Sequence, residues 1–279
     1  MLILEAAPIA SKVEPGQFIQ IRCAEGWDPF LPRPMSVYRV EEDKLFILYE
    51  VVGKGTARMA QIEKGHPVEI YGPLGRPFFR VPEATHCFLV GGGVGLAPFY
   101  ALAEAFLKNR SPISHPPRPK ITVLFGARTR ARVYCEDDFQ RLGVPFEVAT
   151  DDGTYGFRGR VTELLEQELV GLPPGETAAL YACGPNVMMR EVCRIAVSRN
   201  LPCQVSLDEP MACGFGICFG CAVKVRVEGR GNRVKDGATK SAEAFELEPN
   251  PKPSTLSPFT YKLACKDGPV FEAREVAWD

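Results

Sequence analysis

The sequence predicts a β + α/β protein in three parts: an antiparallel β-barrel (residues 1–82), a parallel-sheet α/β domain (83–204) and a small cysteine-loop domain (205–279). Three observations support this division. Short apolar runs broken by turn residues fill the first part, strand-like and helix-like runs alternate through the second, and three cysteines crowd into residues 213–221 of the third. With 279 residues, 46% of them apolar, the chain is long enough for more than one core.

Strand-like runs dominate the first part of the chain. FIQIRC, MSVYRV, LFILYEVV and PVEIYG are rich in β-branched and aromatic residues, and Gly or Pro stands near their ends. Several short strands with little helix between them are typical of a small antiparallel barrel.

The second part has a different pattern of predicted elements. The apolar runs CFLVGGG, KITVLFG, PFEVAT and ALYACG each lead into a glycine or a turn, and stretches of helical periodicity lie between them. In the last such stretch Met188, Val192, Ile195 and Ala196 fall on one helix face. Strand and helix in alternation predict a parallel sheet.

Charge and hydropathy exclude some classes of partner. Lys and Arg (33) nearly cancel Asp and Glu (34), so the net field offers no general attraction to nucleic acid or to anionic lipid. The N-terminus has no basic segment before a long apolar core, as a secretory signal would. The most apolar stretch, residues 87–103, is broken by three glycines and Pro98. We therefore expect a cytoplasmic protein with no nucleic-acid or membrane partner.

The cysteine loop MACGFGICFGCA carries the most specific signal. In the reducing cytosol clustered thiols more often bind metal than form disulfides. Cys213, Cys218 and Cys221 have the C-x4-C-x2-C spacing of plant-type 2Fe-2S centres, and Cys265 supplies a fourth thiolate. Zinc is the competing metal, although structural zinc usually takes its ligands as two close pairs. The glycines of the loop allow its amides to turn toward sulfur.

The remaining six of the ten cysteines are scattered singly along the chain. A free cysteine of this kind is usually a small buried hydrophobe. We expect that role for Cys23, Cys87, Cys135, Cys183, Cys193 and Cys203.

Two segments of the first part together suggest a flavin nucleotide site. RPMSVY places Arg33 and Ser36 at the start of a strand, and LYEVVGKGTARMA supplies Gly53, Gly55 and Thr56 before a short helix. Thr56 can cap that helix, and its free N–H groups beside glycine backbone suit a diphosphate, with Arg33 as phosphate clamp. Taken alone, each segment is equally explained as an ordinary barrel strand or helix start.

A second nucleotide site is predicted in the α/β part. GGGVGLAP (residues 91–98) follows a strand and opens a helix, which suits a pyrophosphate, although it is not a GxGxxG fingerprint. ALYACGP ends at the same edge of a parallel sheet, so its last three residues either border a nicotinamide or merely turn the chain. NADP is not excluded, because Arg128, Arg130 and Arg132 either meet a 2′-phosphate or form a solvated basic loop.

The order of these motifs resembles a known family. RPMSV, VVGKGTARM, GGGVGLAPF, TDDGTYGFRGRVTELL, YACGPNVMM, EPMACGFGICFGCAV and CKDGPVF together look like the electron-transfer subunits of type 1B dihydroorotate dehydrogenases, in the ferredoxin reductase superfamily. The likeness covers nearly the whole chain except a polar insertion at residues 229–258.

The resemblance implies a role for each motif. FAD would be held by Arg33, Pro34, Met35, Ser36, Leu48, Tyr49, Glu50, Gly55 and Thr56. NAD would be held by Gly91, Gly92, Gly93, Val94, Gly95, Cys183, Gly184 and Pro185. A 2Fe-2S cluster would be held by Cys213, Cys218, Cys221 and Cys265. Ser36 and Cys183 would lie near the contact of flavin and nicotinamide, and no residue is assigned a catalytic role.

The resemblance also implies a partner. A separate FMN-containing catalytic subunit would oxidise dihydroorotate in pyrimidine biosynthesis, in a heterotetramer with two copies of each chain. Electrons would pass from FMN through the cluster and FAD to NAD. The alternatives are a subunit of a sulfide- or ferredoxin-linked NAD(P)H oxidoreductase with the same cofactors, an oxygenase reductase, and a zinc-stabilised interaction module that is no enzyme.

Two features depart from the family pattern. The family usually has an additional strand before the segment that starts here at Leu2, which leaves FAD affinity open. It also has a short link between its third and fourth cysteines, whereas 43 residues separate Cys221 from Cys265 here. Because loop-closure cost grows only logarithmically with length, we expect the long link to alter the docking surface rather than the cluster.

Overall fold

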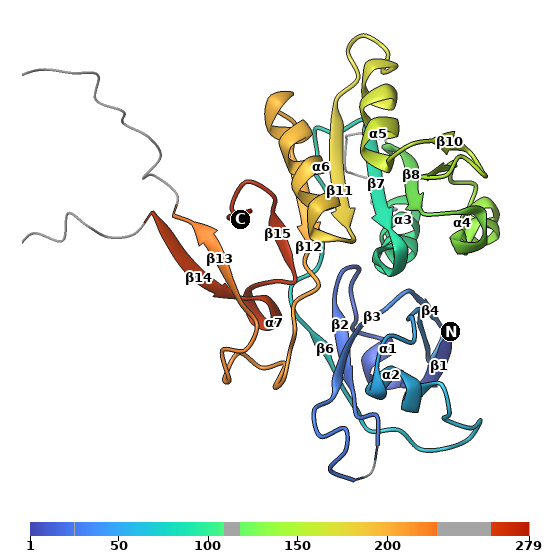
Figure 1. Ribbon diagram of the computed structural model, residues 1–279, viewed down its shortest axis with the longest axis vertical. Coiled ribbons are helices and arrows are strands. Elements are labelled where there is room, and N and C mark those ends of the chain that lie inside the picture. The colour runs from blue at the N-terminus through green and yellow to red at the C-terminus, as the bar shows by residue number, and fades with distance from the viewer. Residues whose placement is uncertain (25, 109–117, 228–257, 279) are drawn as a thin grey trace, which may run out of the picture.

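The computed structural model describes residues 1–24, 26–108, 118–227 and 258–278. Figure 1 shows three blocks: an α/β unit, a β-rich unit below it and a hairpin segment to one side. The insertion predicted at residues 229–258 lies outside the described residues, apart from residue 258.

The N-terminal unit consists of two small antiparallel sheets. Their strand orders are β1-β5-β4 and β3-β2-β6. The strands are β1 (Leu2–Glu5), β2 (Phe18–Ile21), β3 (Arg33–Ser36), β4 (Arg39–Glu41), β5 (Lys44–Ile47) and β6 (Ile70–Leu74). Helices α1 (Ala7–Ala10) and α2 (Lys54–Met59) accompany them. Both sheets contribute to one core that includes Ile19, Ile21, Leu45 and Ile47. The predicted antiparallel strands are confirmed, but in the described residues they form two three-stranded sheets around a shared core rather than one continuous barrel sheet.

A seven-stranded sheet in the order β10-β9-β8-β7-β11-β12-β15 forms the second unit. Its strands are β7 (His86–Gly92), β8 (Lys120–Ala127), β9 (Phe146–Thr150), β10 (Phe157–Arg158), β11 (Ala178–Cys183), β12 (Cys203–Ser206) and β15 (Val270–Glu272). All neighbours pair in parallel except β12 and β15, which are antiparallel. The predicted parallel α/β sheet is therefore confirmed.

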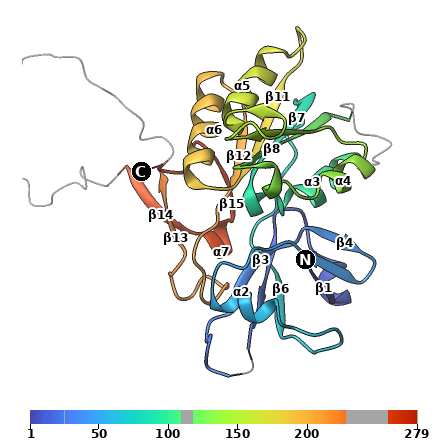
Figure 2. The same ribbon diagram turned by 45° about the vertical axis from the view of Figure 1, so that its right-hand side comes forward.

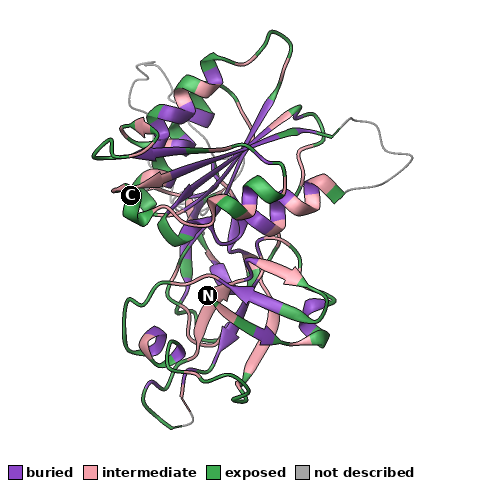
Figure 3. Cartoon of the chain, turned by 90° about the vertical axis from the view of Figure 1, so that its right-hand side faces the viewer, coloured by how far each residue is buried: buried purple, intermediate pink, exposed green. Residues whose placement is uncertain are grey.

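Helices cover both faces of this sheet. Successive residues of a strand point to opposite faces, so β7 gives Phe88 and Val90 to one core and Cys87 and Leu89 to another. Helices α5 (Val161–Val170) and α6 (Asn186–Ser198) pack on the first core, and α3 (Phe99–Lys108) and α4 (Glu136–Arg141) on the second. Figure 3 shows the strands as a buried layer between partly exposed helices.

The cysteine loop joins the two units. It leads from β12 to a hairpin of β13 (Ala222–Arg226) and β14 (Phe259–Leu263), followed by α7 (Ala264–Asp267) and β15. Figure 2 shows this segment beside both the sheet and the N-terminal unit. Although the sequence analysis assigned residues 205–279 to a separate domain, their strand β15 extends the α/β sheet.

Five of the six single cysteines are buried, as predicted, whereas Cys135 is half-buried. Among the described residues no helix combines the length and the apolarity needed to cross a bilayer.

Candidate functional site

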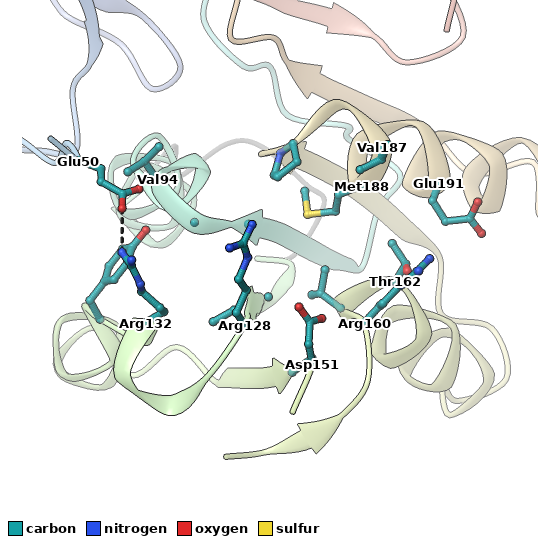
Figure 4. Close-up of a pocket in the computed structure, with 18 of the residues that line it drawn as sticks. Glu50, Val94, Arg128, Arg132, Asp151, Arg160, Thr162, Val187, Met188 and Glu191 are labelled. Carbon is teal, nitrogen blue, oxygen red and sulfur yellow. Dashed lines mark hydrogen bonds and ion pairs between the residues drawn. The ribbon is translucent and has the colours of Figure 1, made fainter. Parts of the chain in front are cut away.

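A cavity of about 1020 Å³ lies at the carboxyl edge of the parallel strands. Figure 4 shows side chains from several elements converging on it. Its walls include Leu48, Tyr49, Glu50, Gly92, Gly93, Val94, Gly126, Arg128, Arg132, Asp151, Arg160, Thr162, Pro185, Val187, Met188, Arg190 and Glu191. The volume is in the range of small-molecule sites. Residues predicted separately for FAD and for NAD thus line one continuous space.

The glycine segment and the Cys183 turn meet at one end of this cavity. The 3-10 turn η1 (Gly93–Leu96) follows β7, and Gly91 pairs with Cys183 of β11 in the sheet. A Cβ on Gly95 would collide with the backbone of Cys183, and one on Gly92 would stand 2.8 Å from the Met188 sulfur. Gly95 therefore needs to be glycine, whereas a side chain at Gly92 would require Met188 to move. Gly91, Gly95, Cys183 and Gly184 shape the site without belonging to the cavity wall.

Burial defines the chemistry of Cys183. Its side chain is 8% exposed. Burial, and next the charge of Asp208, raise the pKa of the thiol to about 12. The thiol is therefore neutral at physiological pH, which does not suit a nucleophile.

The three arginines of the basic loop have different partners. Arg132, in η2 (Arg130–Arg132), donates to Glu50 at 2.8 Å, and Arg130 donates to Glu136 at 3.0 Å and covers the Tyr155 ring. Arg128 has no hydrogen-bond or ion-pair partner among the described side chains and extends into the cavity (Figure 4). Of the three arginines considered for a 2′-phosphate, only Arg128 therefore stays a candidate.

Sequence reasoning missed several cavity residues, among them Asp151, Arg160, Thr162 and Glu191. Asp151 directly follows β9 at the edge where ligands of open parallel sheets bind. The predicted strand PFEVAT ends one residue earlier, so continuing each strand by one residue would have found Asp151. Arg160 lies at the start of α5, within the motif TDDGTYGFRGRVTELL, which the resemblance included without a role for any of its residues.

The predicted flavin segments converge on Arg33 and Gly55. A Cβ on Gly55 would stand 2.5 Å from Arg33 Nε and 2.8 Å from its Cζ, so the guanidinium lies directly against the glycine backbone. Arg33 Nη1 also donates to the Leu31 carbonyl at 2.6 Å, which fixes its direction. Since α2 has only six residues, the fixed positive charge comes from Arg33 rather than from the helix.

Thr56 is not the N-terminal cap that the sequence analysis expected. Gly53 holds the cap position, and Thr56 is the third residue of α2. Its hydroxyl reaches back and accepts from the backbone N–H groups of Val52 (3.0 Å) and Gly53 (3.2 Å). Thr56 therefore stabilises the turn that precedes α2, although it is itself a residue of the helix.

The four cysteines of the metal prediction come together around the loop. Backbone amides point at their sulfurs: Phe215 N and Ile217 N at Cys213 Sγ (3.4 Å each), Gly216 N at Cys265 Sγ (3.1 Å) and Gly220 N at Cys218 Sγ (3.4 Å). Cys265 N donates to Cys221 Sγ at 3.4 Å. Gly214 and Gly216 have φ of +74° and +77°, which gives the loop this inward turn.

The thiols differ in acidity. The backbone amides of Cys218, Ile217 and Phe215 lower the pKa of Cys213 to about 6. Burial, and next the adjacent Cys221, raise the pKa of Cys265 to about 12. In the described residues no three His, Cys, Asp or Glu side chains already lie at the distances of a closed metal site. The loop therefore supplies thiol ligands and N–H donors, and metal binding would draw the sulfurs together and release protons.

The loop is also packed against the N-terminal unit. The Tyr71 hydroxyl of β6 donates to the Cys213 carbonyl at 3.2 Å, and the rings of Tyr71 and Phe215 stack with centroids 5.0 Å apart. The proposed redox loop and the predicted flavin unit are thus in direct contact.

Comparison with known proteins agrees with this arrangement. Residues 89–194 match the oxidoreductase NAD-binding domain family. The chain also resembles a solved NADH-dependent reduced ferredoxin-NADP oxidoreductase, described for flavin-based electron bifurcation, with a TM-score of 0.74 and 28% identity over 99% of this chain and 84% of that one. A ferredoxin reductase of carbazole 1,9a-dioxygenase shares the fold over 68% of this chain and 58% of that one, with a TM-score of 0.53 at 22% identity. The fold and cavity therefore define an NAD-linked oxidoreductase.

Full-length relatives make the family specific. The electron transfer subunit of dihydroorotate dehydrogenase B (NAD(+)) from Desulforamulus reducens is 33% identical over 277 residues, 99% of this chain and 91% of the relative. The subunit from Geobacillus thermodenitrificans is 36% identical over 279 residues, with the same two coverages. The chain belongs to the family of dihydroorotate dehydrogenase B electron transfer subunits. The family confirms the predicted function class and excludes a module without enzymatic function.

Proposed function

We propose that this chain holds FAD and a 2Fe-2S cluster between an FMN-containing catalytic subunit and NAD, so that electrons from dihydroorotate leave as NADH. FAD is assigned to residues 1–82, NAD to 83–204 and the cluster to 205–279. One observation carries the proposal: the cysteine loop packs on β6 of the flavin unit through Tyr71, and the same unit lines the nucleotide cavity through Leu48–Glu50. The N-terminal unit is therefore in contact with both the cysteine loop and the nucleotide cavity.

The residues around Arg33 fit a flavin diphosphate. Its guanidinium is fixed by the Leu31 carbonyl and lies against the Gly55 backbone, so its positive charge stands beside the glycine at the start of α2. Ser36 ends β3, the strand that starts at Arg33, and so places a hydroxyl on the same strand. When bound, FAD supplies a carrier that takes single electrons from iron and gives up a pair as hydride.

The cysteine loop fits an iron-sulfur cluster. Four thiols and a set of inward amides match the ligands and hydrogen bonds that set the potential of such clusters. Zinc also accepts four thiolates but does not need N–H donors to tune a potential. Iron in anaerobically purified protein, with absorption from the near ultraviolet to the red, supports the cluster; a colourless zinc protein would refute it.

The partner would dock at the exposed tip of the cysteine loop. Phe215, Ile217 and Phe219 are 55%, 75% and 69% exposed there. Apolar side chains at this density usually mark an interaction surface. We propose that the FMN-containing subunit covers them, in an assembly with two copies of each chain.

NAD is the proposed acceptor. Asp151 stands where a carboxylate can hydrogen-bond ribose hydroxyls, and it would repel a 2′-phosphate. Arg130 and Arg132 are held by Glu136 and Glu50, so of the three arginines in the basic loop Arg128 is the one that would favour NADP. Steady-state reduction of NAD and NADP by the complex separates the two, and a lower KM for NADP would overturn this assignment.

The central test uses the complex. The chain, expressed with its FMN-containing partner, should reduce NAD with dihydroorotate, and the chain alone should catalyse only NADH-dependent dye reduction. The likeness to the NADH-dependent reduced ferredoxin-NADP oxidoreductase favours a second candidate, in which ferredoxin is the electron partner. Reduction of NAD that requires ferredoxin and fails with dihydroorotate would select that candidate.

A further inference from the structure

Gln20 is a polar side chain between the flavin unit and the cysteine loop. It lies in the middle of β2, opposite Pro34 of β3 and Tyr71 of β6. Its neighbours Ile19 and Ile21 point into the core of the N-terminal unit. Since side chains alternate along a strand, Gln20 points to the other side, where the cysteine loop packs. A Cβ on Gly214 would stand 3.1 Å from Gln20 Cγ and 3.2 Å from its Nε2.

The carboxamide of Gln20 lacks partners within the described residues. The residue is 0% exposed, and neither its Nε2 nor its Oε1 makes a hydrogen bond. Buried amides are nearly always hydrogen-bonded, because an unpaired one loses its water contacts without compensation. Gln17, three residues earlier, shows the usual pattern: its Nε2 donates to the Gly75 carbonyl at 2.8 Å and its Oε1 accepts from Glu14 N.

The contact with Gly214 indicates which group could accept a hydrogen bond from Gln20. Gly214 directly follows Cys213, and the donors to the Cys213 sulfur include the backbone amides of Phe215 and Ile217, which come after that glycine in the chain. Sulfur ligands of a cluster carry negative charge and accept several N–H bonds. A side-chain amide held against the same loop offers a further donor.

We propose that Gln20 is a positioning residue that donates an N–H hydrogen bond to the sulfur atoms of the cluster on the Cys213 side. The inference rests on the proposed function, since it needs a 2Fe-2S cluster in the loop. A donor of this kind favours the more negative, reduced state of the cluster. Gln20 therefore raises the reduction potential of the cluster while the flavin potential stays the same.

The test measures both potentials in the purified complex. Gln20→Met keeps the volume and removes both N–H groups, and Gln20→Glu keeps the shape and adds negative charge. Each should lower the equilibrium constant for cluster reduction by about threefold to tenfold, where tenfold corresponds to 59 mV for one electron. Redox titration followed by electron paramagnetic resonance gives the cluster value, and absorbance gives that of FAD.

Two further variants separate hydrogen bonding from packing. Gln20→His restores an N–H donor of similar reach and should return the potential toward that of the wild type. Gln17→Met removes an amide that the chain itself satisfies, so it should lower stability and leave the cluster potential unchanged.

Three results would overturn the inference. The first is an unchanged cluster potential in both Gln20→Met and Gln20→Glu, with iron content equal to wild type. The second is a shift of the flavin potential alone, because it would place the amide on FAD. The third is zinc instead of iron in the wild-type chain, which would remove the proposed function as well and so differs visibly from the other two.

Discussion

Replacing Gly55 by alanine should weaken FAD binding without weakening the fold. The added methyl group would stand 2.5 Å from Arg33 Nε, closer than nonbonded atoms approach, so the guanidinium must move away. A charge-assisted hydrogen bond is worth roughly 1.5–3 kcal/mol, so its loss should raise the Kd for FAD by about 10- to 100-fold. Gly55 lies within α2, where alanine is more favourable than glycine by roughly 1 kcal/mol. Stability should therefore stay equal or rise.

Titration of apoprotein with FAD, followed by flavin fluorescence, measures the Kd, and thermal unfolding measures stability. Arg33→Ala should weaken FAD to the same extent, and the double variant should be little worse than either single one, since both remove one interaction. Gly171→Ala is the matched control, because a Cβ there meets only ordinary contacts at 3.6 Å. A Gly55→Ala protein with wild-type FAD affinity would refute the assignment of Arg33 as phosphate clamp.

Three other predictions follow from separate parts of the molecule. Cys265→Ser should abolish the cluster spectrum and leave NADH-dependent dye reduction intact; loss of both would contradict separate sites. Because burial raises the pKa of Cys183 to about 12, iodoacetamide should spare it at pH 8 and react about tenfold faster per pH unit up to pH 11, by mass spectrometry; fast labelling at pH 8 would contradict this. Tyr38→Phe removes the 2.7 Å bond to Asp138 and should cost about 1.5–3 kcal/mol in urea unfolding; an unchanged midpoint would show that the bond adds nothing.

The parallel sheet and the gathering of four cysteines around one loop were predictable because each has a local signature. Buried parallel strands such as β11 are apolar throughout, so ALYAC stands out from its surroundings. The cysteine spacing reflects the short loop that turns its amides inward around Cys213 and Cys218. Both signals depend on neighbours along the chain, which a sequence displays directly.

Contacts between distant segments could not be predicted in the same way. The ion pair of Arg132 with Glu50 joins residues 82 positions apart, and nothing in RTRAR indicates which arginine would be paired. Asp151 enters the cavity only because β9 lies next to β8 in the sheet. In the sequence Gln20 looks like an ordinary strand residue, and only the fold shows that it lies against Gly214. These features depend on tertiary packing, which local patterns do not encode.

Strand β15 restricts how electrons can travel. The chain leaves the sheet at β12, forms the cysteine loop and returns as the immediate neighbour of β12, with Ser206 opposite Val270. Adjacent strands are about 4.8 Å apart, so both ends of the segment that carries the four cysteines are held on the same sheet. We expect this double anchor to oppose a swinging-arm movement of the cysteine loop. Turnover should therefore be insensitive to solvent viscosity, and the tunnelling distance should be set once, at folding.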